Sequence, residues 1–451
     1  MWEVRLWCAL WAACCLLAQA PPPDGSKAYE DQPGDQDQPT VLAREKGRPG
    51  ERSGKLLDVR FYADIAGVYD TGLIAPSVNG AGVTTAATFG IETGYGIIGT
   101  RRWKHGQLSV DYRGTDRHYS TRQLIQGLDQ FLDLSYSHQF EHHLEADLKE
   151  TAGDVSLANG IYSYLPLTST DWFAIPYNEL FDIRTRFAQS RIDLTWQKTA
   201  RLSFGIGGDG YLVRRSSMLL AGLDGYSVRA SAAYRLSRGQ TVSVDYNQSR
   251  FDFQNTFGNA RLQSAAAGYA VELSPRWQFA VRGGAILVDS LNIAQVAVDP
   301  AIAAIIGRSF ANVTRFQSVY APLAEVMLER RFERSVFTLQ GSKGVSPGNG
   351  VYLTSRQTAA GLSYSYAGYG RWTLGVNAGY DELATIGQTL GKYTNLQGGA
   401  GVTYRMGPET HLELRYDYRH YTTQNALYQK DSSRLSLGLA FSAGATPLAI
   451  W

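Results

Sequence analysis

The stretch LDVRFYADIAGVYD, from Leu57 to Asp70, decides how the chain folds. Every second position from Leu57 to Tyr69 carries an apolar or small residue, whereas the positions between them include Arg60 and Asp64. Successive side chains of a β-strand point to opposite faces, so this period of two gives one apolar and one polar face. The stretch therefore predicts a strand that lies between an apolar and an aqueous environment.

The same alternation recurs along the chain and gives 18 segments in all. Named by their bounding residues, the segments are Leu57–Tyr69, Val83–Tyr95, Leu108–Tyr112, Leu132–Tyr136, Leu144–Leu148, Ile192–Trp196, Leu202–Ile206, Tyr226–Tyr234, Val242–Tyr246, Tyr269–Leu273, Trp277–Val281, Ala324–Leu328, Phe337–Leu339, Leu362–Tyr366, Trp372–Val376, Val402–Met406, Leu412–Tyr418 and Leu435–Phe441. No helical period of 3.6 residues is sustained anywhere in the chain after residue 20. We therefore expect an all-β chain of 18 strands, with 16 as the alternative count.

The connections between these segments alternate in length, which distinguishes a membrane barrel from a soluble sandwich. Short links are expected at Thr100–Gly106, Glu141–His143, Lys198–Arg201, Ser237–Gly239, Ser274–Arg276, Arg331–Arg334, Ala367–Gly370 and Gly407–Thr410. Longer links are expected at 70–81, 114–127, 152–183, 213–224, 251–260, 289–313, 341–356, 381–392 and 421–432. Short turns on one side and long loops on the other are typical of outer-membrane barrels. The pattern predicts a transmembrane antiparallel up-and-down β-barrel over residues 56–442, with both ends on the periplasmic side.

Aromatic residues gather at the predicted strand ends, as expected at the two membrane interfaces. Beside the short turns lie Trp103, Trp196, Trp277, Trp372, Phe140, Tyr234, Phe332, Tyr366, Tyr404 and Phe441. At the opposite ends lie Tyr69, Tyr112, Tyr226, Tyr246, Tyr320, Tyr380 and Tyr418. A general preference of aromatics for strands explains their presence but not this banding. The two groups therefore predict one aromatic girdle on each side of the membrane.

The N-terminal segment 1–20 has the features of a secretory signal peptide. Arg5 precedes 12 apolar residues, and the segment ends in Ala18-Gln19-Ala20. All three cysteines lie within this segment, so no disulfide or thiolate site is expected after its removal. Residues 21–55 are rich in Pro, Gly and charged residues and read as a disordered periplasmic tether. These features place the chain in the bacterial outer membrane, reached through the periplasm.

The chain resembles porin-type outer-membrane proteins from about residue 57 to 441. The resemblance rests on the export signal, the even strand count, the unequal loops and a last strand, Arg434–Phe441, that ends in an aromatic residue. It implies outer-membrane lipid and the barrel-assembly machinery as partners, and a homo-oligomer, a trimer by analogy alone. The sequence departs from the family in its tail, 443–451, so either Phe441 or Trp451 is the insertion signal.

Charged residues at the polar positions of the strands are expected to line the lumen, because a charge facing lipid costs about 2–4 kcal/mol at mid-membrane. The pore-lining candidates are Asp111, Arg113, Arg191, Asp193, Arg229, Arg282, Glu325, Arg371, Arg405, Arg415, Asp417 and Arg419. A barrel of this size is wide enough for an aqueous channel. The alternative is that opposite charges on adjacent strands pair and brace the wall.

The longest predicted loop, Gly153 to Asp182, resembles the third long loop of general porins, which folds into the lumen as a constriction. Its acidic residues, the constriction-loop candidates, are Asp154, Asp171, Glu179 and Asp182. Facing arginines on the wall, such a loop would produce a transverse field that orients dipolar solutes. The alternative is an extracellular loop with ordinary solvated charges.

Enzyme-like patterns in the sequence are weak. The glycines from Gly205 to Gly210 match a dinucleotide-binding spacing but lack its strand-to-helix context. No cofactor or metal is expected, and a net charge of +2 does not suggest a nucleic-acid partner. The expected function is passive diffusion of small hydrophilic solutes through a porin-like channel, without catalysis. The alternatives are a barrel enzyme using His118 or His420 near one rim, and a structural or secretion conduit.

Overall fold

A computed structural model describes residues 57–72, 87–120, 127–141, 143–156, 184–217, 220–297, 310–367, 371–386, 391–423 and 429–442. The predicted signal peptide (1–20), tether (21–55) and tail (443–451) lie outside these ranges. Within them there is no helix with the length and hydropathy needed to cross a membrane.

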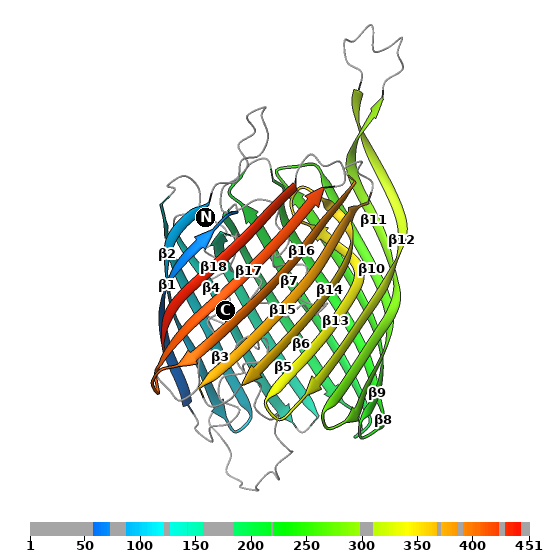
Figure 1. The fold of residues 1–451 in the computed structure, drawn as a ribbon. Coiled ribbons are helices and arrows are strands. Elements are labelled where there is room, and N and C mark those ends of the chain that lie inside the picture. The colour runs from blue at the N-terminus through cyan, green and yellow to red at the C-terminus, as the bar shows by residue number, and fades with distance from the viewer. Residues whose placement is uncertain are drawn as a thin grey trace, which may run out of the picture. The chain divides into compact units, whose positions relative to one another are not determined.

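The fold is an 18-stranded antiparallel β-barrel, as the alternation of residues predicted. The strands are β1 Leu57–Asp70, β2 Thr88–Trp103, β3 Gly106–Tyr119, β4 Gly127–Glu141, β5 Leu144–Ser156, β6 Arg184–Gln197, β7 Leu202–Arg215, β8 Gly222–Ser237, β9 Gln240–Gln254, β10 Gly258–Ser274, β11 Trp277–Ala297, β12 Phe310–Arg331, β13 Ser335–Gly348, β14 Leu353–Ala367, β15 Trp372–Thr385, β16 Lys392–Arg405, β17 Thr410–Thr423 and β18 Gln429–Ser442. Each strand pairs with its neighbours in sequence, and β1 pairs with β18 from Tyr62↔Ser442 to Asp70↔Arg434. The sheet is therefore closed (Figure 1).

The outer face of the barrel is apolar, which is the inverse of a soluble protein. On β1, Phe61 and Ile65 are exposed on the outside, whereas Tyr62 and Asp70 on the alternate positions are buried inside. Leu435, Leu437 and Leu439 repeat this pattern on β18, each with about half of its side chain exposed. A face of this kind needs lipid around it, so the fold is a transmembrane barrel of the outer-membrane type.

Aromatic side chains at the strand ends are exposed on this outer face, as predicted. Next to the short turns, Trp103 packs edge-on against Tyr136 at 6.4 Å, and Trp372 lies 4.6 Å from the ring of Tyr404. Arg330 covers the neighbouring ring of Trp277 at 4.6 Å. Toward the opposite ends, Tyr226 is exposed near the start of β8, whereas Tyr246 and Tyr320, predicted to lie there too, are exposed near the middle of β9 and β12.

Two of the links predicted to be long are short. Residues 255–257 alone join β9 to β10, and residues 349–352 join β13 to β14. The left-handed backbone of Asn255 (φ 63°) and of Gly350 (φ 88°) allows these tight turns. These strands extend further toward this rim than the sequence predicted. Their inward positions become apolar there, as at Phe251 and Phe253, so polar and apolar residues no longer alternate. The period of two that identifies a strand with a wet inner face is lost there.

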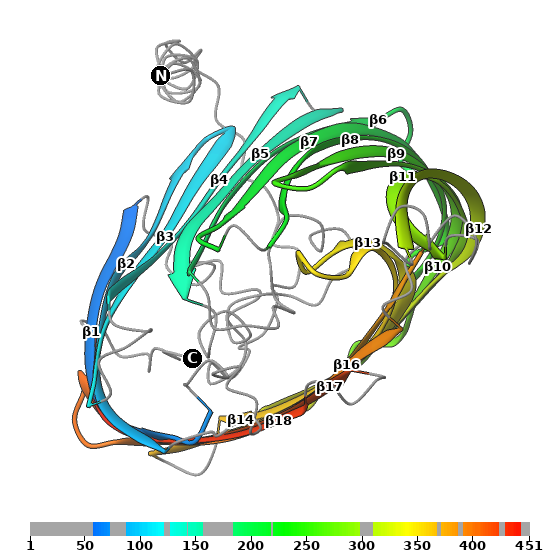
Figure 2. The same ribbon diagram turned by 90° about the horizontal axis from the view of Figure 1, so that it is seen from above.

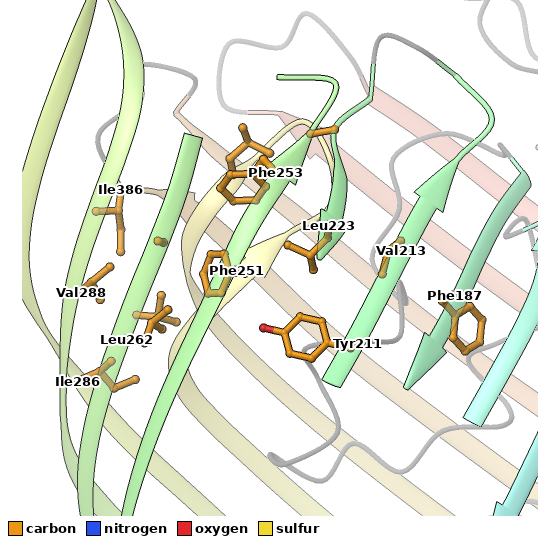
Figure 3. Packing of buried hydrophobic residues seen from close by; sticks show 14 of the residues in the cluster. Phe187, Tyr211, Val213, Leu223, Phe251, Phe253, Leu262, Ile286, Val288 and Ile386 are labelled. Atoms are coloured by element: carbon orange, nitrogen blue, oxygen red, sulfur yellow. The ribbon is translucent and has the colours of Figure 1, made fainter. Parts of the chain in front are cut away.

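These inward apolar residues form a cluster on the inner wall of β4–β12 (Figure 3). It contains Phe131, Val155, Phe187, Tyr211, Val213, Ala221, Leu223, Phe251, Phe253, Ala260, Leu262, Ile286, Val288, Ala321, Val345, Leu353 and Ile386, with Val319 and Leu323 packed against it. The members from β13 and β14 reach the wall because the turn between these strands crosses the mouth. There the N–H of Ala221 donates to the carbonyl oxygen of Gly350 at 3.0 Å.

The hydrogen-bond ladder between β12 and β13 is incomplete. It runs from Arg331↔Val336 to Ala324↔Lys343 and stops, although the described parts of both strands continue beyond these residues. β12 keeps its pairing with β11, and β13 keeps its pairing with β14 up to Gly348↔Leu353. Seen along the barrel, β13 turns from the wall into the interior beside β12 (Figure 2). We call the separated parts, residues 313–323 of β12 and 344–348 of β13, the β12–β13 seam.

Candidate functional site

A row of charged side chains runs around the inner face of β3 to β12, and we call it the charge belt. Its members are Asp111, Arg113, Asp133, Lys149, Arg191, Asp193, Asp209, Arg229, Asp245, Arg282 and Glu325. The strand register places them in sequence around the wall: Asp111 lies opposite Asp133, and Lys149 lies opposite Arg191. The belt therefore follows from the inward parity of each strand combined with the pairing of its neighbours.

At one end of the belt, the ion pairs are local. Arg113 and Asp111 are two residues apart on one face of β3, and the Arg113 Nε donates to Asp111 Oδ1 at 2.7 Å. The Lys149 Nζ lies 3.5 Å from Asp133 Oδ2 on the adjacent strand.

In the middle of the belt, Arg229 of β8 joins carboxylates from two strands. Its Nη2 lies 3.0 Å from Asp193 Oδ1 on β6, and its Nη1 lies 2.6 Å from Asp209 Oδ1 on β7. The second oxygen of Asp193 accepts a hydrogen bond from Arg191 Nε at 2.5 Å. In this part of the wall, each arginine therefore contacts at least one carboxylate.

At the other end, Arg282 of β11 lies between Asp245 of β9 and Glu325 of β12. The Arg282 Nε is 3.1 Å from Asp245 Oδ2, and its Nη1 is 3.2 Å from Glu325 Oε1. These three side chains keep 24%, 24% and 18% of their surface exposed. They are paired with one another and still face open space inside the barrel.

A second group of charges lies where the first and last strands meet, and it is buried. Glu92 of β2 accepts a hydrogen bond from Arg434 of β18 and lies 3.4 Å from Arg117 of β3. Arg117 is also 2.8 Å from Asp129 of β4. Each of these side chains has less than a tenth of its surface exposed. We call the four residues the closure cluster.

Most of the residues predicted to line a pore have their side chains on the inner face of their strands. Arg415 and Asp417 pair at 2.6 Å on the inner face of β17, and Arg419 follows at the next inward position. Arg371 was predicted to line the pore, but it lies exposed in the turn before β15. Arg405 is the last residue of β16, at a turn, where its Nε donates to the carbonyl oxygen of Gly407. Their positive charges lie at the turn side, away from the belt.

The constriction-loop candidates fared differently. Asp154 is a correction, because β5 continues through it and its side chain binds Arg184 at 2.6 Å and Arg186 at 3.0 Å near the strand end. The strand continues here because its inner face carries Val155, which belongs to the apolar cluster. Asp171, Glu179 and Asp182 lie outside the described residues.

Sequence reasoning missed Asp209 and three members of the closure cluster, Glu92, Arg117 and Asp129. Arg117 lay inside the predicted link 114–127, and Glu92 lay in a strand for which inward positions were not assigned. Extending the parity of β3 by two residues beyond Thr115 would have placed Arg117 in the lumen.

The two histidines considered for catalysis are apart. The His118 Nε2 lies 3.0 Å from Asp116 on β3, and the His420 Nδ1 lies 2.7 Å from Asp431 across β17 and β18. The strands β18, β1 and β2 separate them, so they do not form one site. Within the described ranges, no group of three or more His, Cys, Asp or Glu side chains is arranged to hold a metal ion.

No family model matches the chain, and no curated protein matches it either. Solved structures share its architecture at a distance. A BenF-like porin from Pseudomonas fluorescens is 9% identical, with 86% of this chain and 99% of that chain covered and a TM-score of 0.44. OpdK of Pseudomonas aeruginosa with vanillate is 11% identical, with 86% and 98% covered and a TM-score of 0.42.

OccAB3 of Acinetobacter baumannii is 11% identical, with 86% of this chain and 100% of that chain covered and a TM-score of 0.40. At this level of identity and superposition, what these proteins bind is not transferred to this chain.

Proposed function

We propose that this chain forms a water-filled channel of the outer membrane, through which small hydrophilic solutes diffuse passively. The observation that carries the proposal is that most of the charge belt, all but the buried Arg113 and Asp209, stays partly exposed inside a closed barrel. Arg191 and Asp193 retain 24% and 29% of their side-chain surface, whereas Arg117 and Glu92 of the closure cluster retain 5% and 7%. Paired charges in a filled interior would be as buried as those of the closure cluster. The exposure of Arg191 and Asp193 is instead that expected of side chains that line a water-filled space.

The chemistry of the belt fits polar solutes without a strong preference for charge. Arginines and carboxylates both line the wall, so anions and cations can each find a partner of opposite charge there. Hydroxyl and amide groups, such as Ser227 and Asn247, continue the same polar surface.

Single-channel recording in planar lipid bilayers tests the proposal. The full chain, refolded and inserted, should give stepwise conductance that is steady at low voltage and linear in salt concentration. Denatured chain in the same detergent is the control. Insertion without conductance, with the folded barrel verified by its heat-dependent migration on a gel, would contradict an open channel and favour the structural or conduit alternative.

A further inference from the structure

A pocket lies between the inner wall of β7–β12 and the part of β13 that turns into the interior (Figure 2). Every strand from β7 to β14 contributes to its lining. The strand register aligns this lining across the wall, because Arg229 lies opposite Asn247 and Asn247 lies opposite Ser264. The pocket is therefore built by regular strands, and it includes members of the charge belt.

The inward charges of this pocket already satisfy one another. Arg229 and Arg282 each contact two carboxylates, among them Asp209 and Glu325, which also line the pocket. A charged solute could bind only by competing with these ion pairs or by adding an uncompensated charge to the site, and both are unfavourable. The ionic groups therefore favour a solute without net charge.

Lys343 borders the pocket but does not change this balance. Its register with Ala324 and Thr358 directs its side chain to the outer face of the barrel. The charges that face the pocket from its lining are thus two arginines and two carboxylates.

Three buried polar atoms of the pocket's lining have no hydrogen-bond partner among the described residues. They are Asn247 Oδ1, Gln357 Oε1 and Ser342 Oγ, and only 1% of Gln357 is exposed. The nitrogens of the two amides already donate, to Ser249 at 3.2 Å and to Asp381 at 2.6 Å. A buried acceptor that lacks a partner is costly, so the two amide oxygens favour a ligand that donates hydrogen bonds.

One side of the pocket is apolar. Leu262, Ile286 and Val345 line it and belong to the apolar cluster of the inner wall, and Leu323 packs against them. An apolar surface beside a few hydrogen-bonding groups suits a solute with both kinds of surface. A pyranose ring is such a solute, since C–H groups occupy its faces and hydroxyl groups its edge.

Hydroxyl groups match the polar side of the pocket better than ions do. A carboxylate accepts from Arg229 and Arg282 but cannot donate to Asn247 or Gln357. An ammonium group donates but cannot accept from the arginines. A hydroxyl group does both, so one neutral polyhydroxyl solute can bind the arginine N–H groups and the amide oxygens together.

We propose that this pocket binds neutral sugars of monosaccharide size during their passage through the barrel. The inference rests on the proposed aqueous channel, because the sugar reaches the pocket from the lumen. Its hydroxyls donate to Asn247 and Gln357 and accept from Arg229 or Arg282, while one face of the ring lies against Ile286. Binding is weak enough for the sugar to leave again, as passage requires.

Binding of glucose to the refolded barrel tests the proposal without requiring a conducting channel. Saturation-transfer difference NMR in an amine-oxide detergent, which contains no sugar, should detect glucose with a dissociation constant on the order of 1 mM. Glucuronate and glucosamine, compared at slightly acidic pH, carry one negative and one positive charge on the same ring. Each should bind about tenfold more weakly than glucose. No binding of glucose, or tighter binding of either charged sugar, would overturn the proposal.

Asn247→Leu tests the assignment of the sugar to this pocket. Removing an acceptor for a ligand hydroxyl should raise the dissociation constant of glucose about tenfold. The matched control is Asn377→Leu, which removes an inward asparagine of β15 outside the pocket and should leave glucose binding unchanged. Heat-dependent migration on a gel verifies that each variant is folded.

Ser342→Ala provides a second test should Asn247→Leu fail to fold. It removes a hydroxyl that has no partner among the described residues, and it should raise the dissociation constant about threefold. Unchanged glucose binding in a folded pocket variant, or an equal loss in Asn377→Leu, would remove the sugar from this pocket.

Single-channel recording of the same protein separates this proposal from that of the aqueous channel. A barrel that conducts ions and does not bind glucose would keep the channel and overturn the sugar site. A barrel that binds glucose and does not conduct would keep the binding site and overturn passage through the lumen.

Discussion

At the residue scale, the charge belt combines two roles that sequence reasoning treated as alternatives. Arg282 braces β9, β11 and β12 by binding Asp245 and Glu325, and the same side chains remain a quarter or less exposed to the lumen. The inward position of each side chain could be predicted from parity alone, because successive side chains of every strand point to opposite faces. The partner of each charge could not, since it depends on rotamers and on the stagger of neighbouring strands.

Arg282→Gln should make the channel more selective for cations. The substitution removes one positive charge and leaves two carboxylates facing the lumen, each worth on the order of 1 kcal/mol in a watery pore before screening. We expect the ratio of K⁺ to Cl⁻ permeability to rise about two- to threefold, measured as the reversal potential in a KCl gradient. The control is Arg330→Gln, which removes the same charge from the outer face beside Trp277. Equal shifts in both variants would argue against a wet belt.

Glu150 is a polar residue in an unexpected place. It lies on the outer face of β5, opposite Leu134 near the middle of β4, and its carboxylate accepts a hydrogen bond from Ser190 at 2.5 Å. A carboxylate facing lipid destabilises a barrel, though less than a lysine or arginine does. Glu150→Leu should therefore raise the free energy of unfolding.

We expect a gain of about 1 kcal/mol, measured by denaturant titration in phospholipid vesicles. Glu145→Leu is the comparison, because that side chain occupies an inward position of the same strand and faces no lipid. Destabilisation by Glu150→Leu would mean that this outer face contacts another chain rather than lipid, in keeping with the homo-oligomer that the porin resemblance suggests.

At the scale of elements, the closure cluster fastens the contact between the first and last strands. Arg434 of β18 reaches past β1 to Glu92 of β2, so three strands are joined by one buried ion pair. Removing one partner of a buried pair leaves an uncompensated charge, which costs about 3–5 kcal/mol. We expect Arg434→Met to lower the free energy of unfolding by that amount in vesicles.

The double variant Arg434→Met with Glu92→Leu should lose less than the sum of the single losses, because neither charge is then left alone. Arg250→Gln serves as the surface control. Its side chain is half exposed and lies 3.5 Å from Asp252, so its loss should cost less than about 1 kcal/mol. Additive losses in the double variant would show that the cluster does not act as a unit.

The strands were largely predictable from the sequence, and the errors in their predicted bounds have a common cause. Alternation identified all 18 strands because polar side chains on the inner face and apolar side chains on the outer face alternate along each strand. Where the interior becomes apolar, as at Phe251 and Leu353, this contrast disappears and strand was taken for loop. The β12–β13 seam was unpredictable for another reason, since only pairing between strands, not the pattern within one strand, reveals it.

At the scale of the whole molecule, an even number of strands places both ends of the barrel on one side. β1 begins at Leu57 and β18 ends at Ser442, both on the side of the short turns. A short epitope tag inserted before Leu57, or after Ser442, should be protected from external protease in intact cells and accessible once the outer membrane is opened. A tag in the turn at residues 255–257, between β9 and β10 on the opposite side, is the control that external protease should cleave in intact cells. Cleavage of an end tag in intact cells would require an odd strand count or an inverted barrel.

Because the first strand pairs with the last, the barrel can close only after the whole chain has been made. The N–H of Thr71 donates to the carbonyl oxygen of Ser433, 362 residues later in the chain, and contacts so distant form slowly. One edge of β1 therefore stays unpaired until β18 has been made. A truncated chain that lacks β18 cannot close and keeps two unpaired strand edges. Unpaired edges pair readily with other chains, so such a product is prone to aggregation and degradation. Closure therefore distinguishes a full-length barrel from a truncated chain, because only the full-length barrel has no unpaired strand edge.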